Sequence, residues 1–282
     1  MARKIMVVTG ASTGIGQATV NLLAEHGYTV FASVRKEADG EQYAANPNIH
    51  PLLMDVTDAA AVKTAAETVQ SQLQPGDSVM GLVNNAGIAV GAPISHVSLS
   101  AVRKQFEVNV VGLIAVTQAF LPLLQAETPG RVVNISSVAG LVTSPFLGIY
   151  SASKHAVEAV SDALRREQMP FGVKVVIVEP GPIATPIWDK GIEKAVEKYS
   201  ATPYAPIVRK MFRYFVDRGK NGFPPADVAA VILTALEAPD PKTRYLVTPG
   251  KFQFLLSKWM PDKMLDRTIY KQLGMDEIAR KR

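Results

Sequence analysis

The stretch "VVTGASTGIGQATV" (7–20) joins a run of apolar, β-branched residues to a segment whose apolar residues follow helical spacing. Three glycines, Gly10, Gly14 and Gly16, lie between the two. Small residues there let the backbone approach a pyrophosphate, whose charge is met by the N–H groups and dipole at the amino end of the helix. The stretch therefore predicts a strand, a nucleotide-binding loop and a helix, with a plain tight turn as the alternative.

The same residues also spell G-x-S-x-G around Ser12, which is the pattern of the nucleophile elbow in α/β-hydrolases. A hydrolase is therefore a rival function. Its mechanism needs a histidine base late in the chain, and residues 156–282 contain no histidine. Ser12 would also follow the first strand, with no earlier strand to supply an oxyanion loop. The hydrolase alternative is disfavoured on both grounds.

Strand-like and helical patterns alternate outward from this stretch. The β-branched runs are 4–9, 29–34, 49–54, 81–85, 131–136, 173–180 and 244–249. The helical patterns are 15–26, 58–73, 98–125, 151–169 and 224–237. This alternation predicts right-handed crossovers and an α/β fold, a single Rossmann-type doubly wound parallel sheet with helices on both faces.

We expect one domain over residues 1–282, because no repeat or linker divides it. The alternation lapses at 183–222, a segment rich in proline, aromatic and basic residues that follows the sixth strand. Ligands of open α/β sheets bind at the carboxyl ends of the strands, so this segment is predicted to be a substrate cap. Residues 249–282 are predicted to form a helical tail.

The composition is that of a globular chain in a reducing compartment. The 282 residues are 48% hydrophobic and 20% charged and include no cysteine, which favours a cytoplasmic location. The four histidines show no metal-ligand spacing, so no metal site is predicted. The net charge is +5, and residues 251–282 hold eight Lys/Arg against four Asp/Glu. The rest of the chain is nearly neutral, which argues against a nucleic-acid partner.

No targeting or membrane-spanning segment is predicted. The apolar run after the first basic residues has only four members, "IMVV", which is too short for a signal peptide. The longest apolar stretch, 108–124, is interrupted by Asn109, Thr117, Gln118 and Pro122 and is short for a bilayer span. A buried helix is the better interpretation.

The segment "YSASK" (150–154) places a tyrosine four residues before a lysine. In a helix the two side chains share one face. A nearby ammonium favours tyrosinate, so we expect Lys154 to lower the pKa of Tyr150 from about 10 towards a catalytic range. A chance occurrence of this spacing is the alternative.

Six motifs occur in order: "TGASTGIG" (9–16), "NNAG" (84–87), Asn109 in "EVNVVG", "NISS" (134–137), "YSASK" and "PGPIAT" (180–185). Together they resemble the short-chain dehydrogenase/reductase family, in its compact branch. The motifs cover residues 5–190, and the sheet pattern extends the likeness to about 248. The resemblance implies that Ser137, Tyr150, Lys154 and Asn109 form a catalytic tetrad.

Carbonyl reduction explains why these residue types are needed. A hydride reaches the carbonyl carbon from a nicotinamide, and Tyr150 would supply the proton to the oxygen. Ser137 would hydrogen-bond the same oxygen. The resemblance implies that Lys154 also holds the nicotinamide ribose and that Asn109 distorts its helix to hold a proton-relay water. A satisfied buried amide is the alternative for Asn109.

Further positions are expected at the cofactor by the same resemblance. Asp55, with Val56 beside it, would meet the adenine amino group, and its alternative role is a turn or cap before the helix at 58. Residues 85–87 would pass under the adenosine ribose, and 180–185 would clasp the nicotinamide. The full set is Gly10, Ser12, Thr13, Gly14, Ile15, Gly16, Arg35, Lys36, Asp55, Val56, Asn85, Ala86, Gly87, Tyr150, Lys154, Pro180, Gly181, Ile183 and Thr185.

Cofactor choice depends on the end of the second strand. NAD-dependent relatives carry a carboxylate where this chain has Val34, and Arg35 and Lys36 follow. An arginine there offers a forked donor to the 2′-phosphate of NADP, and Thr13 could add a hydroxyl contact. We therefore expect NADP(H) to be preferred, with NAD(H) possible. An ordinary solvated arginine is the alternative.

The expected substrate is a hydrophobic ketone or aldehyde, or the corresponding alcohol. The expected pocket residues are Val138, Leu141, Phe146, Ile187 and Trp188. The sequence looks most like the 17β-hydroxysteroid and retinol dehydrogenase relatives, which implies a steroid- or retinoid-like substrate. A catalytically silent, cofactor-sensing module is the alternative from another functional class.

The segment 251–274 carries apolar residues at helical spacing among lysines. A helix pair packed on its own subunit is one interpretation, and a surface that rests on anionic membrane is the other. In relatives the final strand often builds a subunit interface. A tail at this point would limit assembly, so a homodimer is expected, with a tetramer as the alternative.

Overall fold

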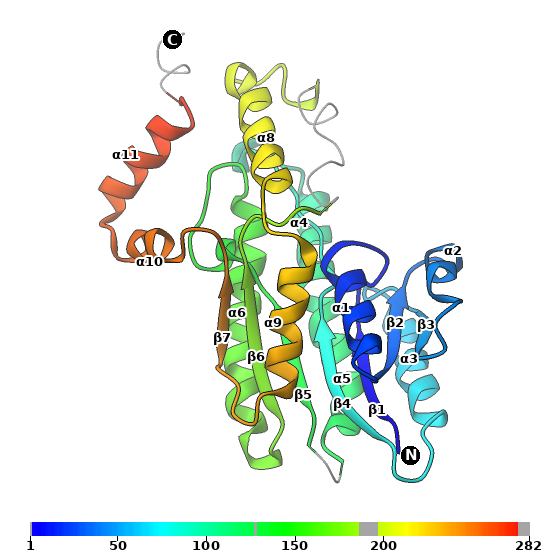
Figure 1. Ribbon diagram of the computed structural model, residues 1–282. Coiled ribbons are helices and arrows are strands. Elements are labelled where there is room, and N and C mark those ends of the chain that lie inside the picture. The colour runs from blue at the N-terminus through cyan, green and yellow to red at the C-terminus, as the bar shows by residue number, and fades with distance from the viewer. Residues whose placement is uncertain (1, 127–128, 186–196, 276–282) are drawn as a thin grey trace.

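The computed structural model describes residues 2–126, 129–185 and 197–275. Its centre is one seven-stranded sheet in the order β3-β2-β1-β4-β5-β6-β7, with every neighbouring pair parallel. The strands are β1 Lys4–Val8, β2 Thr29–Val34, β3 Ile49–Leu53, β4 Ser78–Asn84, β5 Arg131–Ile135, β6 Lys174–Pro180 and β7 Arg244–Val247. The predicted doubly wound fold is confirmed (Figure 1).

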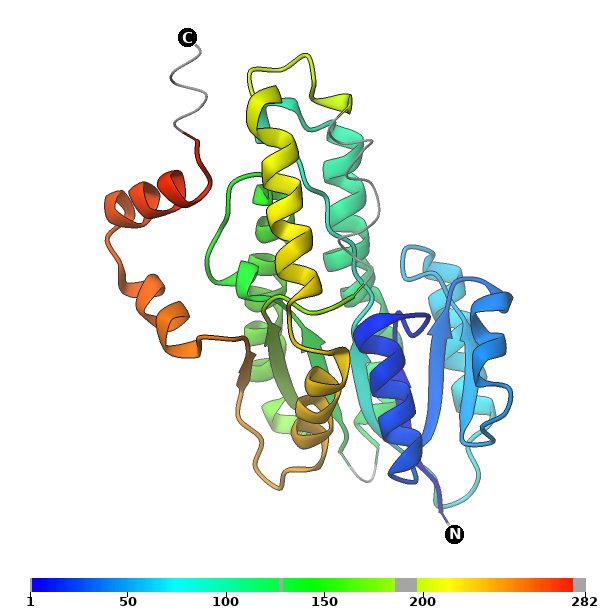
Figure 2. The same cartoon turned by 45° about the horizontal axis from the view of Figure 1, so that its top comes forward.

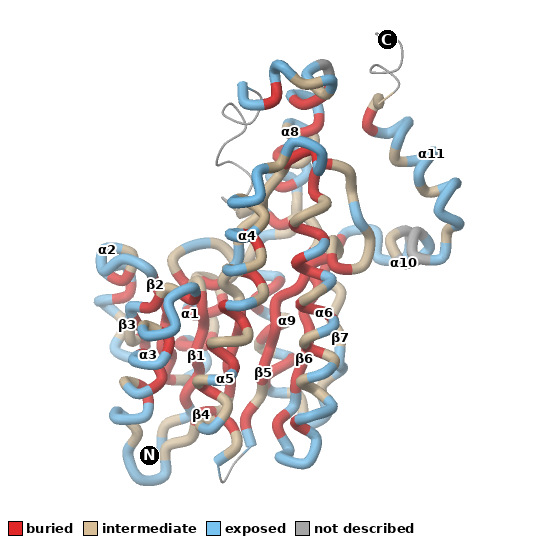
Figure 3. Tube along the Cα trace, turned by 180° about the vertical axis from the view of Figure 1, so that it is seen from behind, coloured by how far each residue is buried: buried red, intermediate tan, exposed pale blue. Residues whose placement is uncertain are grey.

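Helices cover both faces of the sheet, as parallel strands require. The helices of the body are α1 Gly14–Glu25, α2 Glu37–Gly40, α3 Ala59–Ser71, α4 Leu99–Phe106, α5 Gly112–Leu124, α6 Gly148–Gln168 and α9 Pro225–Glu237. Helices α1 and α9 pack together on one face, and α3, α5 and α6 cover the other (Figures 1 and 2). The buried residues follow the strands and the inward sides of these helices (Figure 3).

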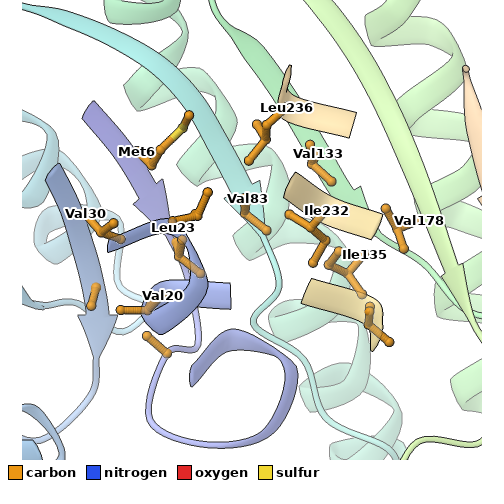
Figure 4. Close-up of a cluster of buried hydrophobic side chains, with 14 of the residues drawn as sticks. Met6, Val20, Leu23, Val30, Val83, Val133, Ile135, Val178, Ile232 and Leu236 are labelled. Carbon is orange, nitrogen blue, oxygen red and sulfur yellow. The ribbon is translucent and has the colours of Figure 1, made fainter. Parts of the chain in front are cut away.

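The core on the α1 and α9 face is made mainly of aliphatic side chains from these two helices and from the strands of the sheet (Figure 4). Leu23 of α1 and Ile232 of α9 are fully buried there, against Val83 of β4 and Val133 of β5. This packing fixes the amino end of α1 next to the carboxyl end of β1. The glycine loop of residues 9–14 spans that junction.

One long helical stretch, Leu99–Leu124, is apolar enough to cross a membrane by length and composition. Its second half is α5, which packs on β4 and α3 and buries Val116, Phe120 and Leu124 completely. The structure thus buries one side of the predicted helix, whereas Gln118 and Pro122 on α5 are exposed. Between α4 and α5 the helix widens into a π-helical turn, Glu107–Val111, which contains Asn109.

The segment after β6 rises above the carboxyl ends of the strands. Its described part contains α8, Ala205–Lys220, which the sequence pattern left unassigned (Figure 2). Two tail helices, α10 Lys251–Trp259 and α11 Asp262–Gln272, follow β7. One small apolar cluster joins the loop before α6, helix α8 and the end of α11. Its buried members include Phe146, Ile207, Met211 and Leu273.

Candidate active site

Three of the four predicted catalytic residues lie together where β5 ends and α6 begins. Ser137 follows β5, and Tyr150 and Lys154 occupy successive turns of α6. The Ser137 hydroxyl and the Tyr150 phenol are hydrogen-bonded. The Lys154 Nζ lies 5.9 Å from the centroid of the Tyr150 ring. All three are buried, with exposures of 8, 7 and 6%, so the surrounding protein sets their acidity.

The pKa of Tyr150 shifts in the opposite direction to the one expected from its spacing to Lys154. Burial raises this pKa above its ordinary value of 10.0, and the hydrogen bond with Ser137 opposes that effect. The expectation failed because desolvation of Tyr150 dominates its pKa and the charge of Lys154 does not offset it. Lys154 is itself buried, which lowers its own pKa to about 8 despite the nearby Glu158 carboxylate. The Lys154 ammonium is instead held by the Ile135 carbonyl, at 2.7 Å. At neutral pH Tyr150 is therefore a protonated phenol, the form required of an acid.

Ser137 is fixed on three sides. Its Oγ accepts a hydrogen bond from the Ala139 N–H at 3.1 Å, which caps the short helix Val138–Gly140. Its hydroxyl donates a hydrogen bond to the Pro180 carbonyl at 3.3 Å, at the end of β6. With the contact to Tyr150, these bonds place one hydroxyl between β5, β6 and α6.

Asn109 lies within the π-helical turn, so the predicted helix distortion at this residue is present. Its amide nitrogen donates to the Ile88 carbonyl at 3.0 Å and to the Ser153 hydroxyl at 3.1 Å. Its Oδ1 accepts from the Ile88 N–H at 2.9 Å. Asn109 is thus a satisfied buried amide that ties the loop after β4 to α6. Its role towards a relay water stays a prediction.

Gln105 is a site-positioning residue that sequence reasoning missed. It is completely buried one turn before Asn109. Its Oε1 accepts from the Val90 N–H, and its Nε2 donates to the Ile88 carbonyl, both at 2.7 Å. The available signal was a polar residue on the helix face that also carries Asn109. Together the Asn109 and Gln105 side chains hold residues 88–90, which follow the "NNAG" motif.

The glycine loop has the conformation and space that a pyrophosphate needs. Gly10 and Gly14 have φ of 66° and 62°, a region that favours glycine. A Cβ on Gly16 would lie 2.3 Å from the Gly10 carbonyl oxygen. Helix α1 starts at Gly14 with no acidic residue in its first turn, and its N-cap residue Thr13 makes no side-chain capping bond. Its amino end is therefore suited to bind a phosphate group.

A buried hydroxyl joins this loop to the end of β4. The Thr9 Oγ1 accepts from the N–H groups of Asn85 and Ala86, both at 3.0 Å. The Asn85 amide donates to the carbonyls of Thr9 and Gly10 at 2.9 and 3.0 Å. The side chain of Asn85 thus shapes the glycine loop, whereas Gly87 is exposed towards solvent.

At the ends of β2 and β3 the predicted residues differ in exposure. Val34 is buried, and Arg35 and Lys36 are the first exposed side chains after it. Asp55 accepts from the Thr57 N–H and hydroxyl at 2.9 and 2.8 Å, so it makes the turn that was its alternative role. The Thr57 N–H is the main cause that lowers the pKa of Asp55, and the charges of Arg35 and Lys104 add to it.

Two other predicted cofactor residues are packed into the core. Val56 is buried with the α3 and α5 side chains, and Ile183 is buried against the α9 face. Gly181 is enclosed as well, since a Cβ on it would lie 2.3 Å from the Thr248 hydroxyl. Thr185, by contrast, lies beside the glycine loop, because a Cβ on Gly14 would lie 3.1 Å from its methyl group. The loop after β6 therefore approaches the start of α1.

The predicted pocket residues differ in burial, and two of them lie outside the described part of the chain. Val138 and Leu141 are half-buried near Ser137. Phe146 is buried, has an unusual φ of 68°, and packs edge-on against Tyr204 with ring centroids 5.4 Å apart. Ile187 and Trp188 lie outside the described residues. A cavity of about 390 Å³ lies between residues 143–148 and α11, next to Phe146.

Ser12 has no catalytic partner of the kind that a hydrolase needs. The four histidines are engaged elsewhere: His26 and His155 with carbonyls of their own helices, His50 with Phe31, and His96 with Tyr204. Among the described residues, no group of three or more His, Cys, Asp or Glu side chains could hold a metal ion. The site thus combines a glycine loop at the start of α1 with a buried tyrosine at the start of α6.

A family model described as short chain dehydrogenase matches residues 4–195. The chain belongs to this family, and it is an oxidoreductase that acts on CH–OH or C=O groups with a nicotinamide cofactor. The hydrolase alternative was therefore wrong, and the family resemblance seen in the sequence is confirmed.

Three relatives illustrate the range of the family. The chain is 44% identical to an NADPH-dependent 3-dehydrocapnine reductase of Ornithobacterium rhinotracheale, with 95% of this chain and 96% of the relative covered. It is 32% identical to a 3-ketodihydrosphingosine reductase of Bacteroides thetaiotaomicron, covering 94 and 96%. It is also 32% identical to human retinol dehydrogenase 5, covering 93 and 86%.

The solved structures agree. A short-chain dehydrogenase from Streptomyces avermitilis matches with a TM-score of 0.76 and 30% identity, covering 100% of this chain and 98% of that one.

Proposed function

We propose that this protein is an NADP(H)-preferring carbonyl reductase in which Tyr150 is the proton donor. The observation that carries the proposal is the buried, hydrogen-bonded pair of Ser137 and Tyr150, with the pKa of Tyr150 raised by burial. A neutral phenol at physiological pH suits the reduction of a ketone better than the oxidation of an alcohol, which would begin from the phenolate.

The chain's own residues account for the proton side of the reaction. When bound, the nicotinamide supplies the hydride to the carbonyl carbon. Tyr150 transfers its phenolic proton to the carbonyl oxygen, and Ser137 donates a hydrogen bond to the same oxygen as negative charge develops on it. The tyrosinate left behind is stabilised by the charge of Lys154, because the single hydroxyl proton of Ser137 is engaged with the substrate oxygen. Asn109 and Gln105 keep the neighbouring loop in place.

The preference for NADP(H) is supported by charge at the end of β2. Arg35 and Lys36 are exposed there, and no carboxylate occupies position 34. The 44% identical relative is described as NADPH-dependent. Arg35 would pair with the 2′-phosphate, and NAD(H) would bind more weakly through the remaining contacts.

We further propose that the substrate is a 3-ketone on a long alkyl chain. Two relatives that match along most of their length are named for substrates oxidised at carbon 3. Apolar residues near Ser137 and Phe146, together with α8 in the proposed cap, are compatible with an alkyl chain. A retinoid or steroid is the alternative substrate, because retinol dehydrogenase 5 is also a relative.

The test is consumption of reduced nicotinamide, followed by its absorbance. We expect NADPH oxidation with 3-ketodihydrosphingosine, and slower or no oxidation with retinal or a 17-ketosteroid. A faster reaction with retinal or the steroid would overturn the substrate proposal while keeping the reductase. A flat response to every carbonyl, with NADPH still bound, would favour the silent cofactor sensor.

We also propose that the protein works as a cytoplasmic homodimer. The absence of cysteine supports a reducing compartment, and β7 lies at the edge of the sheet with the tail beyond it. Light scattering measures the assembly directly: a dimer mass is expected, and a tetramer would show that the tail does not limit association.

A further inference from the structure

Helix α10 carries three large apolar side chains along one face, and all three lie in solvent. Phe252, Leu256 and Trp259 occupy positions i, i+4 and i+7, which share one side of a helix. Their exposed fractions are 74, 52 and 87%. We call them the α10 stripe. An exposed apolar patch of this kind marks a contact surface.

The next helix, α11, anchors this stripe to the body. Its inward side carries Ile269 and Leu273, which pack into the apolar cluster formed with α8. The Gln272 amide donates to the Tyr214 hydroxyl at 3.0 Å. Anchored in this way, α10 and α11 lie along one side of the molecule, and most of their described residues are exposed (Figure 3).

Basic residues are interleaved with the apolar ones on this surface. Residues 251–275 hold five Lys/Arg against two Asp/Glu. Lys251, Lys263, Arg267 and Lys271 are exposed, and Met264 and Tyr270 lie exposed between them. Together with the α10 stripe they give a surface that is apolar and positively charged at once.

This combination fits an anionic lipid surface better than a second copy of the chain. A symmetric contact would place the same positive patch against itself, which is repulsive. Anionic head groups attract the lysines and arginine, while the interfacial region accepts Trp, Phe and Leu side chains. Tryptophan favours that region because its ring is apolar and its N–H needs a polar partner.

The cavity beside α11 connects this surface with the catalytic helix. Its walls include Ile269, Tyr270 and Met275 on the tail side, and Phe146 and Gly148 on the other. Gly148 is the first residue of α6, two residues before Tyr150. A lipophilic molecule leaving a membrane at the tail would therefore meet an apolar hollow next to the site.

We propose that α10 and α11 dock the protein on anionic membrane, with the α10 stripe inserted at the head-group level and the exposed basic residues facing the lipid charges. This docking goes beyond the proposed reductase activity and does not depend on which ketone is reduced.

Flotation with vesicles tests the proposal on the full chain. Vesicles of phosphatidylcholine with phosphatidylglycerol should carry the wild-type protein at low salt. Pure phosphatidylcholine vesicles or high salt should reduce binding by roughly fivefold for each basic residue that contacts the lipid. The double variant Phe252→Ser/Trp259→Ser should lose at least about tenfold in binding, because two inserted side chains are removed.

Phe171→Ser is the matched control. Phe171 is also an exposed phenylalanine, 53% accessible, but it follows α6 at the opposite end of the sheet. This variant should float like the wild type. NADPH-linked reduction of a short soluble ketone should be unchanged in the double variant, which shows that the fold is intact.

Three outcomes would overturn the docking proposal. They are no flotation of the wild type at low salt, full flotation of the double variant, or a double variant that converts a dimer to a monomer without any vesicle binding by the wild type. The last outcome would assign the α10 stripe to a subunit interface. None of them bears on the reductase proposal, which is measured without vesicles.

Discussion

The floor of the active site and the tail beside it are stabilised by different interactions. In the floor, buried amides and hydroxyls of Asn109, Gln105 and Thr9 hold the loops with hydrogen bonds of 2.7–3.1 Å. In the tail, apolar side chains pack around Leu273 while Trp259 remains exposed. Hydrogen bonds are directional and fix atoms, whereas apolar packing is not directional and tolerates changes of shape. Chemistry is therefore concentrated in the first region and adaptable contact in the second.

Tyr150→Phe gives the sharpest test of the floor. Removal of the phenolic hydroxyl should lower kcat by ~10²-fold or more, while NADPH binding stays near the wild-type value, because this hydroxyl is proposed to act on the substrate oxygen. Steady-state rates and cofactor titration by fluorescence measure the two effects. Tyr28→Phe removes a hydroxyl that contacts only Glu237 among the bonds described, and it should keep full activity. A Tyr150→Phe enzyme with a third of the normal rate would remove Tyr150 from the mechanism.

Arg35→Ala tests whether the exposed residues that follow β2 take part in cofactor binding. A charge-assisted hydrogen bond contributes ~1.5 to 3 kcal/mol, so NADPH should bind roughly ten- to a hundredfold more weakly and NADH almost unchanged. Dissociation constants for both cofactors give the answer. Lys63→Ala on α3, an exposed lysine paired with Glu67, is the control. Equal catalytic efficiency of the wild type with both cofactors would contradict the assignment.

Gln105→Leu tests how far the floor depends on one buried amide. The substitution leaves the Val90 N–H without its acceptor and removes one donor from the Ile88 carbonyl. The free energy of unfolding should therefore fall by about 1 to 3 kcal/mol. kcat should fall as well, because the loop after "NNAG" loses a support. Gln118→Leu, at an exposed position of α5, should leave both unchanged. Chemical denaturation and steady-state rates measure the two effects. A lower stability with an unchanged kcat would show that Gln105 supports the fold but not the reaction.

The smallest effect is expected from Glu158→Gln, one turn after Lys154. The Glu158 carboxylate raises the pKa of Lys154, which burial lowers to about 8. Removal of that negative charge should lower the pKa further and move the alkaline limb of the pH–rate profile to lower pH. Glu158 and Asp162 both pair with Arg244, at 3.1 and 3.0 Å, but only Glu158 raises the pKa of Lys154. Asp162→Asn is therefore the control. An alkaline limb that stays in place, or moves upward, would contradict this account.

The alternation of strands and helices predicted the sheet well because local spacing decides which side of each element is buried. The final strand and the helix α9 were predicted within a few residues. Ser137, Tyr150 and Lys154 likewise lie together, because α6 begins above the carboxyl end of β5, where Ser137 follows the strand. The helix α8 was missed because the proline and aromatic content of its segment was given more weight than the helical spacing of Ile207, Val208 and Met211.

Other features depended on contacts between residues distant in the sequence. Gln105 and Thr9 look unremarkable by type, and their roles come from partners about 15 and 76 residues away. The pKa of Tyr150 was predicted in the wrong direction because the spacing to Lys154 contains no information on burial. Asp55 and Val56 are adjacent in sequence, yet one makes a turn and the other enters the core.

The parallel sheet, the glycine loop and the residue types of the proposed catalytic group follow from the sequence, since they depend on periodicity and on what each side chain can do chemically. The raised pKa of Tyr150, the hydrogen bonds of Asn109 and the exposure of the α10 stripe follow from contacts in the folded protein. Those properties depend on desolvation and on neighbours supplied by other elements, which local sequence does not specify.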